Sequence, residues 1–288
     1  MRECRARCSR PDIRASPTSP LSATRGSPPA SRAGSSGADV STGTPSKIVV
    51  IGATSAIAEH TLRLWLGTGA RSALLVGRDS ARLEALAADL RVRFPAAALA
   101  VSAVDLTDPA AISAVVASSL EGGAPDTVLI AHGAMTSQEE ASADLAVARD
   151  VLVVTGVSVA LWLEAYANAL PSGTIGVLGS VAGDRGRKTN YVYGSAKGLV
   201  ERFAQGLQHR LAGSRLSVVL VKPGPTDTPM TAHIKQSGGA LAPVESVARD
   251  VVAALASGRA VAYAPAKWRV IMTVIKLLPA PVFNRLNI

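Results

Sequence analysis

Residues 47–60 read KIVVIGATSAIAEH, and this stretch decides the fold. Residues 48–51 form a wholly apolar run that ends at Gly52, as is typical of a buried parallel strand. Small residues follow at once, and a helical pattern begins near residue 55. A tight turn between a strand and a helix points backbone N–H groups and the helix N-terminus at a bound diphosphate. The stretch therefore indicates either a dinucleotide-binding turn or an ordinary strand-to-helix connection.

Beyond this turn, short apolar runs and helical patterns alternate as far as residue 257. We expect strands at 47–52, 73–76, 99–104, 127–131, 174–179 and 216–221, and helices at about 55–68, 79–92, 108–119, 140–170, 191–213 and 244–257. Strands that alternate with helices predict a parallel sheet covered on both faces. The sequence therefore predicts an α/β protein with a doubly wound Rossmann fold: one domain over 46–263, followed by an amphipathic tail over 264–288.

The first 45 residues are rich in Ser, Pro and Arg and lack apolar periodicity, which predicts disorder. Their composition also fits a transit peptide, or translation from too early a start. Both cysteines, Cys4 and Cys8, lie in this segment, so the domain itself has no disulfide. This pattern fits a reducing cytoplasm, and two cysteines without further ligands nearby predict no metal site.

The formal net charge is +9, but only 3% of the residues are aromatic and no basic run is interleaved with aromatic side chains. Nucleic-acid binding usually needs clustered cations and stacking platforms, so we expect no nucleic-acid partner. No stretch of eighteen uncharged apolar residues appears, so we expect no membrane-spanning helix.

The candidate dinucleotide contacts begin with the residues of the first turn, which are Gly52, Thr54, Ser55, Ala56 and Ile57. Arg78 follows the second strand, where a carboxylate would favour NAD and an arginine can hold the 2′-phosphate of NADP. The sequence therefore favours NADPH over NADH, although Arg78 also reads as a solvated charge at a helix start. Asp105 and Leu106 end the third strand, where the carboxylate can accept a hydrogen bond from the adenine amino group.

The catalytic candidates are Ser180, which follows a strand, and Tyr193 and Lys197 on the next helix. The Tyr and Lys are four residues apart and share one helix face. A lysine cation there is expected to lower the tyrosine pKa and make the phenol a proton donor or acceptor near neutral pH. Ser180 can hold a substrate carbonyl oxygen. A Pro223-Gly224 turn after the last strand then places Thr228 to bind a nicotinamide carboxamide.

Together these motifs resemble the short-chain dehydrogenase/reductase family across residues 46–263. The resemblance implies a Rossmann fold, NAD(P)(H), and reversible hydride transfer between a ketone and a secondary alcohol. It assigns Tyr193 as the acid/base, Lys197 as its partner and a ribose ligand, and Ser180 as the carbonyl stabiliser. It also places His132 and Gly133 at the cofactor, where the family commonly has Asn-Asn-Ala-Gly.

The chain departs from the family pattern in two places. Val153 stands where many members carry the Asn of a proton relay, which puts that relay in doubt. His132 replaces an Asn, either as a local hydrogen-bonding residue or as a group for substrate or proton traffic.

The C-terminal part is similar to a narrower group, the decaprenylphosphoryl 2-keto-pentose reductases. That likeness implies a keto sugar on a polyprenyl phosphate as substrate, a flavin oxidase partner that supplies the ketone, and an arabinose donor for cell-wall polysaccharide as product. We also expect a homo-oligomer. The tail combines apolar residues with Lys267, Arg269 and Lys276, which predicts either contact with a membrane surface or packing at a dimer interface or over the substrate pocket.

Two other functions stay open on the sequence alone. One is a short-chain reductase of a soluble ketone or acyl thioester. The other is a Rossmann protein that senses NAD(P) without catalysis, against which the intact Ser180, Tyr193 and Lys197 group argues.

Overall fold

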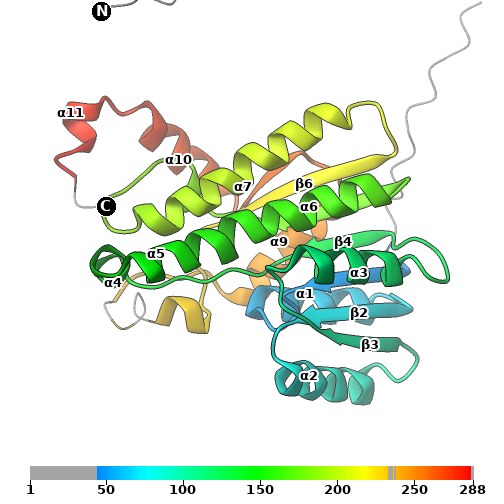
Figure 1. The fold of residues 1–288 in the computed structure, drawn as a ribbon. Helices are drawn as coiled ribbons and strands as arrows, with labels where there is room; N and C mark the ends of the chain where they lie inside the picture. The colour runs from blue at the N-terminus through cyan, green and yellow to red at the C-terminus, as the bar shows by residue number, and fades with distance from the viewer. Residues whose placement is uncertain (1–43, 233–235, 237, 287–288) are drawn as a thin grey trace, which may run out of the picture. The chain divides into compact units, whose positions relative to one another are not determined.

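The computed structural model describes residues 44–232, 236 and 238–286, so the prediction of disorder over residues 1–45 lies almost wholly outside the described residues. The described part of the chain contains seven strands (Figure 1): β1 (Lys47–Ile51), β2 (Ser72–Gly77), β3 (Ala98–Ala103), β4 (Thr127–Ile130), β5 (Gly173–Leu178), β6 (Leu216–Pro223) and β7 (Val261–Ala264). The main helices are α1 (Ala56–Gly67), α2 (Ser80–Arg93), α3 (Pro109–Ser119), α4 (Gln138–Ala143), α5 (Leu145–Leu152), α6 (Ser158–Ala169), α7 (Tyr191–Arg210), α9 (Val244–Ala256), α10 (Lys267–Leu277) and α11 (Ala280–Phe283).

The strands form one parallel sheet in the order β3-β2-β1-β4-β5-β6-β7. The order reverses between β1 and β4, which pair with Ile51 opposite Ile130. In sheets of this kind, ligands bind outside the carboxyl ends of the strands at the point of reversal. The predicted Rossmann fold is confirmed, and the first turn lies at this point.

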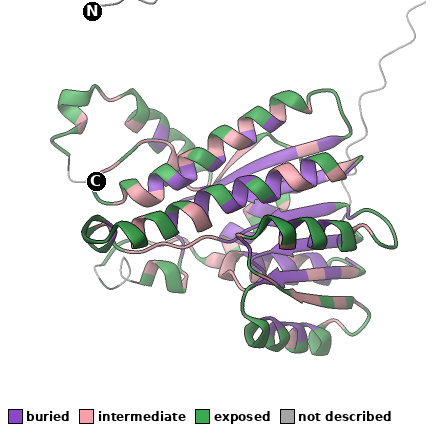
Figure 2. Cartoon of the chain, in the orientation of Figure 1, coloured by how far each residue is buried: buried purple, intermediate pink, exposed green. Residues whose placement is uncertain are grey.

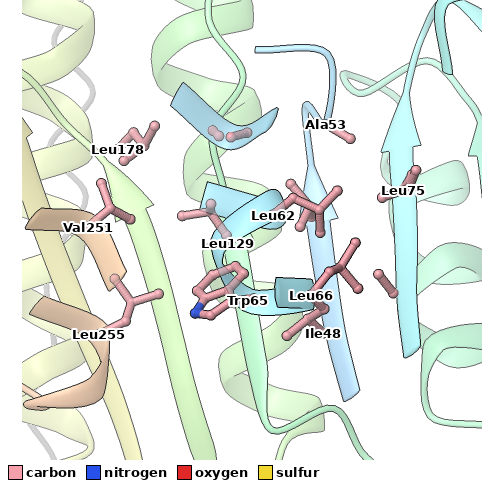
Figure 3. Close-up of a cluster of buried hydrophobic side chains, with 14 of the residues drawn as sticks. Ile48, Ala53, Leu62, Trp65, Leu66, Leu75, Leu129, Leu178, Val251 and Leu255 are labelled. Carbon is pink, nitrogen blue, oxygen red and sulfur yellow. The ribbon is translucent and has the colours of Figure 1, made fainter. Parts of the chain in front are cut away.

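Two apolar cores cover the two faces of the sheet, because successive side chains of β1 point in opposite directions. Ile48 and Val50 belong to the core beneath α1, α2 and α9, which Figure 3 shows in part. Val49 and Ile51 belong to the core beneath α3, α6 and α7. The buried stripes of these helices lie against the sheet and their exposed faces point outward (Figure 2). The central strands that end at the site are therefore packed on both faces.

The helical stretch expected over 140–170 is interrupted twice. Asp144 ends α4 and caps α5, accepting a hydrogen bond from the Ala146 N–H at 2.7 Å. A π-helical turn, Val153–Val157, then joins α5 to α6. Inserted π turns often lie at functional sites. Strand β7 was not expected and adds a seventh strand at the edge of the sheet.

By length and composition, the helical run Leu145–Ala169 could cross a membrane. Its largest side chains are, however, completely buried against the sheet: Trp162 and Tyr166 are both 0% exposed. The core of a folded domain accounts for this apolar composition.

Candidate active site

The first turn has the geometry expected of a diphosphate site. Gly52 has φ +79°, and a Cβ there would lie 2.6 Å from the backbone nitrogen of His132, so no other residue fits without strain. Ser55 provides no side-chain cap for α1. The N–H groups of Ala56 and Ile57 donate to no residue that the structure describes. A helix N-terminus with free donors suits a dinucleotide diphosphate.

Arg78 and Asp105 both lie at the carboxyl edge of the sheet, just after β2 and β3, as predicted. Hydrogen bonds from the N–H and hydroxyl of Thr107 lower the pKa of Asp105, and the Arg78 charge lowers it further. Asp79 caps α2 by accepting from the Arg82 N–H at 3.0 Å, so this acid is engaged within the helix start. Arg78 is exposed and lies where the adenosine end of a dinucleotide would come.

A cavity of about 370 Å³ adjoins the first turn on the side of α2. Thr54 and Arg82 line it, together with Glu59, Arg63, Ala85, Leu86 and Asp89. The phosphate-binding candidate Thr54 therefore has open space beside it.

The structure brings Ser180, Tyr193 and Lys197 together. Ser180 follows β5, and its hydroxyl accepts from the Ala182 N–H at 3.1 Å and forms a hydrogen bond with Tyr193. The Lys197 Nζ lies 5.9 Å from the centre of the Tyr193 ring. Lys197 is buried and donates to the backbone oxygen of Leu178 at 2.7 Å. The lysine is thereby held by the last residue of β5, next to the strand end that carries the serine.

The expected low tyrosine pKa is wrong for this structure. Burial raises the pKa of Tyr193 to about 12, and the hydrogen bond with Ser180 only partly opposes that rise. Burial also lowers the pKa of Lys197 to about 8. Burial disfavours the charged form of each group, which raises the pKa of the tyrosine and lowers the pKa of the lysine. Tyr193 is therefore a proton donor across the neutral range.

The lysine pKa predicts a pH dependence. We expect kcat/KM for ketone reduction by the free enzyme to fall as pH rises through about 8, because Lys197 then loses the charge that stabilises the tyrosine oxygen after proton donation. In Lys197→Arg the cation persists, so the fall should move above pH ~10. A pH profile of kcat/KM measures this, and a fall that stays near 8 in the arginine variant would contradict the assignment.

His132 is buried, and its Nε2 lies 2.8 Å from the hydroxyl of Ser158. Burial and the Lys197 charge lower its pKa to about 3, so the imidazole is neutral at physiological pH. Its Nδ1 has no hydrogen-bond partner in the described part of the chain. This geometry fits the local hydrogen-bonding interpretation better than proton transfer, since a neutral histidine with so low a pKa does not take up a proton readily.

The π turn brings Thr155 under the segment that follows β4. The Thr155 hydroxyl accepts from the Ala134 N–H and donates to the Ala134 oxygen, both at 2.8 Å. Gly133 lies between this threonine and Lys197: a Cβ on it would be 3.4 Å from Thr155 Cγ2 and 3.7 Å from Lys197 Nζ. Val153, which stands where many family members have an Asn, has no polar side chain. Thr155 is the polar residue of the π turn, and it lies near the lysine.

The Pro223-Gly224 turn ends β6, and the Gly224 N–H donates to Ala264 at the end of β7. Thr228 follows it and caps a short helix with Thr231, beside a cavity of about 560 Å³. The tail residue Trp268 lies directly against this turn. A Cβ on Gly224 would be 1.9 Å from the indole nitrogen, so glycine is required here.

A buried ion cluster at this edge was not predicted. The Asp184 carboxylate, which is 0% exposed, pairs with the buried Lys222 and accepts from the Tyr263 hydroxyl at 3.1 Å. Lys222 also pairs with Glu201 of α7 at 2.8 Å. The sequence signal was Lys222 itself, because a charged residue at the end of a buried apolar strand needs partners.

The tail is fastened to the same segment. Lys276 of α10 lies 3.5 Å from the Asp184 carboxylate. The next residue, Arg185, donates to the backbone oxygens of Ile275 and Leu278 and lies 3.7 Å from the centre of the Phe283 ring. Figure 1 shows α10 and α11 following β7 at one end of the domain. The tail helices are therefore held against the segment between Ser180 and Tyr193.

The fold and this site define an NAD(P)-dependent oxidoreductase. The short chain dehydrogenase family profile matches residues 46–239, so the chain belongs to that family. An uncharacterized oxidoreductase of Mycobacterium tuberculosis is 34% identical over 245 residues, which are 83% of this chain and 96% of that one. Another uncharacterized oxidoreductase, from Streptomyces coelicolor, is 31% identical over 251 residues, which are 85% of this chain and 97% of that one.

Solved structures agree on the fold. A short chain dehydrogenase of Burkholderia cenocepacia, in complex with NADP, superposes with a TM-score of 0.71 at 21% identity. The match covers 86% of this chain and 99% of that chain.

Proposed function

We propose that the protein reduces a keto group to a secondary alcohol with NADPH, and that its substrate is a 2-keto-pentose on a polyprenyl phosphate. The observation that carries the reaction is the Ser180, Tyr193 and Lys197 group at the carboxyl edge of the sheet, beside the Pro223-Gly224 turn. When bound, the nicotinamide supplies a hydride to the carbonyl carbon.

The protein's own residues handle the oxygen and the proton. Ser180 donates a hydrogen bond to the carbonyl oxygen and orients it toward the Tyr193 hydroxyl. Tyr193 is protonated at neutral pH and gives its proton to that oxygen as negative charge develops. Lys197 stabilises the phenolate that remains, and the Leu178 oxygen holds its ammonium in place. The alcohol leaves with one new C–H bond and one new O–H bond.

The lipid-linked substrate rests on the tail likeness and on the tail's surface. Its exposed apolar residues include Val270, Val274 and Leu277, which are 69%, 57% and 77% exposed. Residues 265–286 carry four basic side chains and no acidic one. Such a surface suits the headgroup region of an anionic membrane, where a polyprenyl phosphate presents its sugar. We therefore place the enzyme at the cytoplasmic membrane surface as a homo-oligomer, receiving its ketone from a flavin oxidase.

The test is direct. Purified protein is incubated with NADPH or NADH and a 2-keto-pentose on a polyprenyl phosphate, and cofactor absorbance is followed. Turnover of this substrate with a kcat/KM well above that of the same keto sugar without the lipid supports the proposal. Equal kcat/KM values for the two would favour the alternative, a reductase of soluble ketones. No turnover of any ketone despite cofactor binding would favour a sensing role.

The cofactor preference gives a separate prediction. We expect NADPH to bind more tightly than NADH, because Arg78 is exposed at the end of β2 and Asp79 is engaged in capping α2. Arg78→Ala should weaken NADPH binding by about 1.5–3 kcal/mol, the range for hydrogen bonds to charged groups, and leave NADH nearly unchanged. Titration calorimetry measures both affinities. Equal wild-type affinities for the two cofactors would refute the preference.

A further inference from the structure

Between the catalytic serine and tyrosine runs a basic turn, Arg185-Gly-Arg-Lys188, which the reaction chemistry does not use. Its first arginine, Arg185, donates hydrogen bonds to backbone carbonyl oxygens of the tail. Asp184, the acidic residue directly before the turn, forms an ion pair with Lys222. Lys188 is exposed. Arg187 is therefore the partly buried cation of the turn, and it forms no ion pair with any residue that the structure describes.

The guanidinium of Arg187 is partly buried, and its Nε is shielded from solvent without a hydrogen-bond partner among the residues that the structure describes. It forms no ion pair with any of them. Burial lowers the pKa of this arginine, and only the more distant Asp184 charge opposes the effect. A shielded cation with an unsatisfied donor is costly unless a ligand completes it. The chemistry that completes a guanidinium best is an oxyanion such as phosphate.

Three residues further on, Asn190 has an unsatisfied acceptor. Its Oδ1 is buried without a partner in the described chain, and it makes no side-chain cap for α7. The Asn190 N–H donates to the Arg187 oxygen at 3.1 Å, so one turn carries both groups. A Cβ on Gly194, the neighbour of Tyr193, would be 3.9 Å from this Oδ1 and 2.9 Å from the Ala182 oxygen. The amide therefore lies at the start of the catalytic helix, close to the segment that follows Ser180.

We propose that this turn is an oxyanion-binding subsite for the substrate, in which Arg187 binds a phosphoryl oxygen and Asn190 accepts a hydrogen bond from a substrate hydroxyl. An unpartnered donor for an anion and an unpartnered acceptor for a hydroxyl, three residues apart in one turn, match a phosphorylated sugar. The inference deepens the proposed function by naming the groups of the substrate that are recognised, and it rests on that function only for the source of the phosphate. A lipid-linked phosphate and a free sugar phosphate share this chemistry.

The first experiment does not depend on turnover. Thermal unfolding of the wild type, Arg187→Ala and Lys188→Ala is measured with increasing inorganic phosphate at saturating NADP⁺, so that the cofactor fills the Arg78 site. A ligand that binds only the folded state raises the Tm. We expect phosphate to raise the Tm of the wild type and of the Lys188 control, and not that of Arg187→Ala. Equal phosphate-dependent shifts in all three would overturn the subsite.

The second experiment identifies the source. Using a keto sugar with and without a phosphate, Arg187→Ala should raise KM for the phosphorylated ketone by about 10- to 100-fold, the effect of lost hydrogen bonds to a charged group, and leave the neutral ketone unchanged. Arg187→Lys should restore part of the loss. If polyprenyl phosphate substrates are not turned over while soluble sugar phosphates show this dependence, the subsite stands and the lipid-linked substrate is refuted. An equal rise in KM for neutral and phosphorylated ketones would show a merely structural role and overturn the inference.

Discussion

Tyr193→Phe is expected to lower kcat for ketone reduction by about 10²- to 10⁴-fold, the range that general acid catalysis supplies. The phenol is the group that hydrogen-bonds Ser180, and its raised pKa keeps it protonated at neutral pH. Phenylalanine keeps the ring and removes only the proton donor. NADPH affinity and thermal stability should therefore change little. Steady-state kinetics with cofactor titration separate the two effects.

Tyr191 provides a matched control on the same helix. Its side chain is 47% exposed, and its hydroxyl lies 3.1 Å from that of Ser142 rather than in the catalytic group. Tyr191→Phe should keep nearly full activity. A Tyr193→Phe variant within threefold of the wild-type rate would remove the acid assignment, and equal losses in both variants would point to a structural effect on α7.

Much of the fold could be predicted because the apolar runs of β1, β4 and β6 are buried on both faces of a parallel sheet and read as continuous apolar sequence. Strand β7 could not, since its four residues, Val261–Ala264, are too short to be told from a loop. The π turn also escaped prediction. Its residues, three valines, a threonine and a glycine, give no pattern that marks an inserted residue, and Gly156 packs against Ala196 of α7 only in the folded chain.

The candidate site, like the fold, could be predicted only in part. Spacing along one helix and order along the chain were enough to place Tyr193, Lys197 and Ser180 together. The pKa values were not predictable, because they depend on burial that no local pattern encodes. Contacts between distant segments were missed for a similar reason. Trp268 against Gly224 and Lys276 against Asp184 join residues more than forty positions apart, and only the folded sheet brings them together.

The tail predicts binding to anionic membranes. We expect wild-type protein to co-sediment with vesicles of anionic phospholipid at low salt, and to bind them less as salt rises, because basic residues near an anionic surface contribute about 1 kcal/mol each. The residues to be mutated are Lys267, Arg269 and Arg285, which are exposed and make no ion pair within the described chain. Lys276 is left unchanged, because it lies 3.5 Å from the buried Asp184 and its reversal would disturb the fold.

Reversing those three charges to Glu removes about 3 kcal/mol of attraction and should weaken vesicle binding by roughly 100-fold or more, while activity on a water-soluble keto sugar survives. Val270→Ser with Leu277→Ser tests the apolar half of the same surface and should weaken binding even at high salt, where the charges are screened. Vesicles of neutral phospholipid are the control for the electrostatic contribution to binding. If wild-type protein does not bind anionic vesicles at low salt, the proposed docking to a membrane surface is refuted. The remaining observations then favour a soluble phosphorylated ketone as substrate, because the subsite at Arg187 requires only the phosphate.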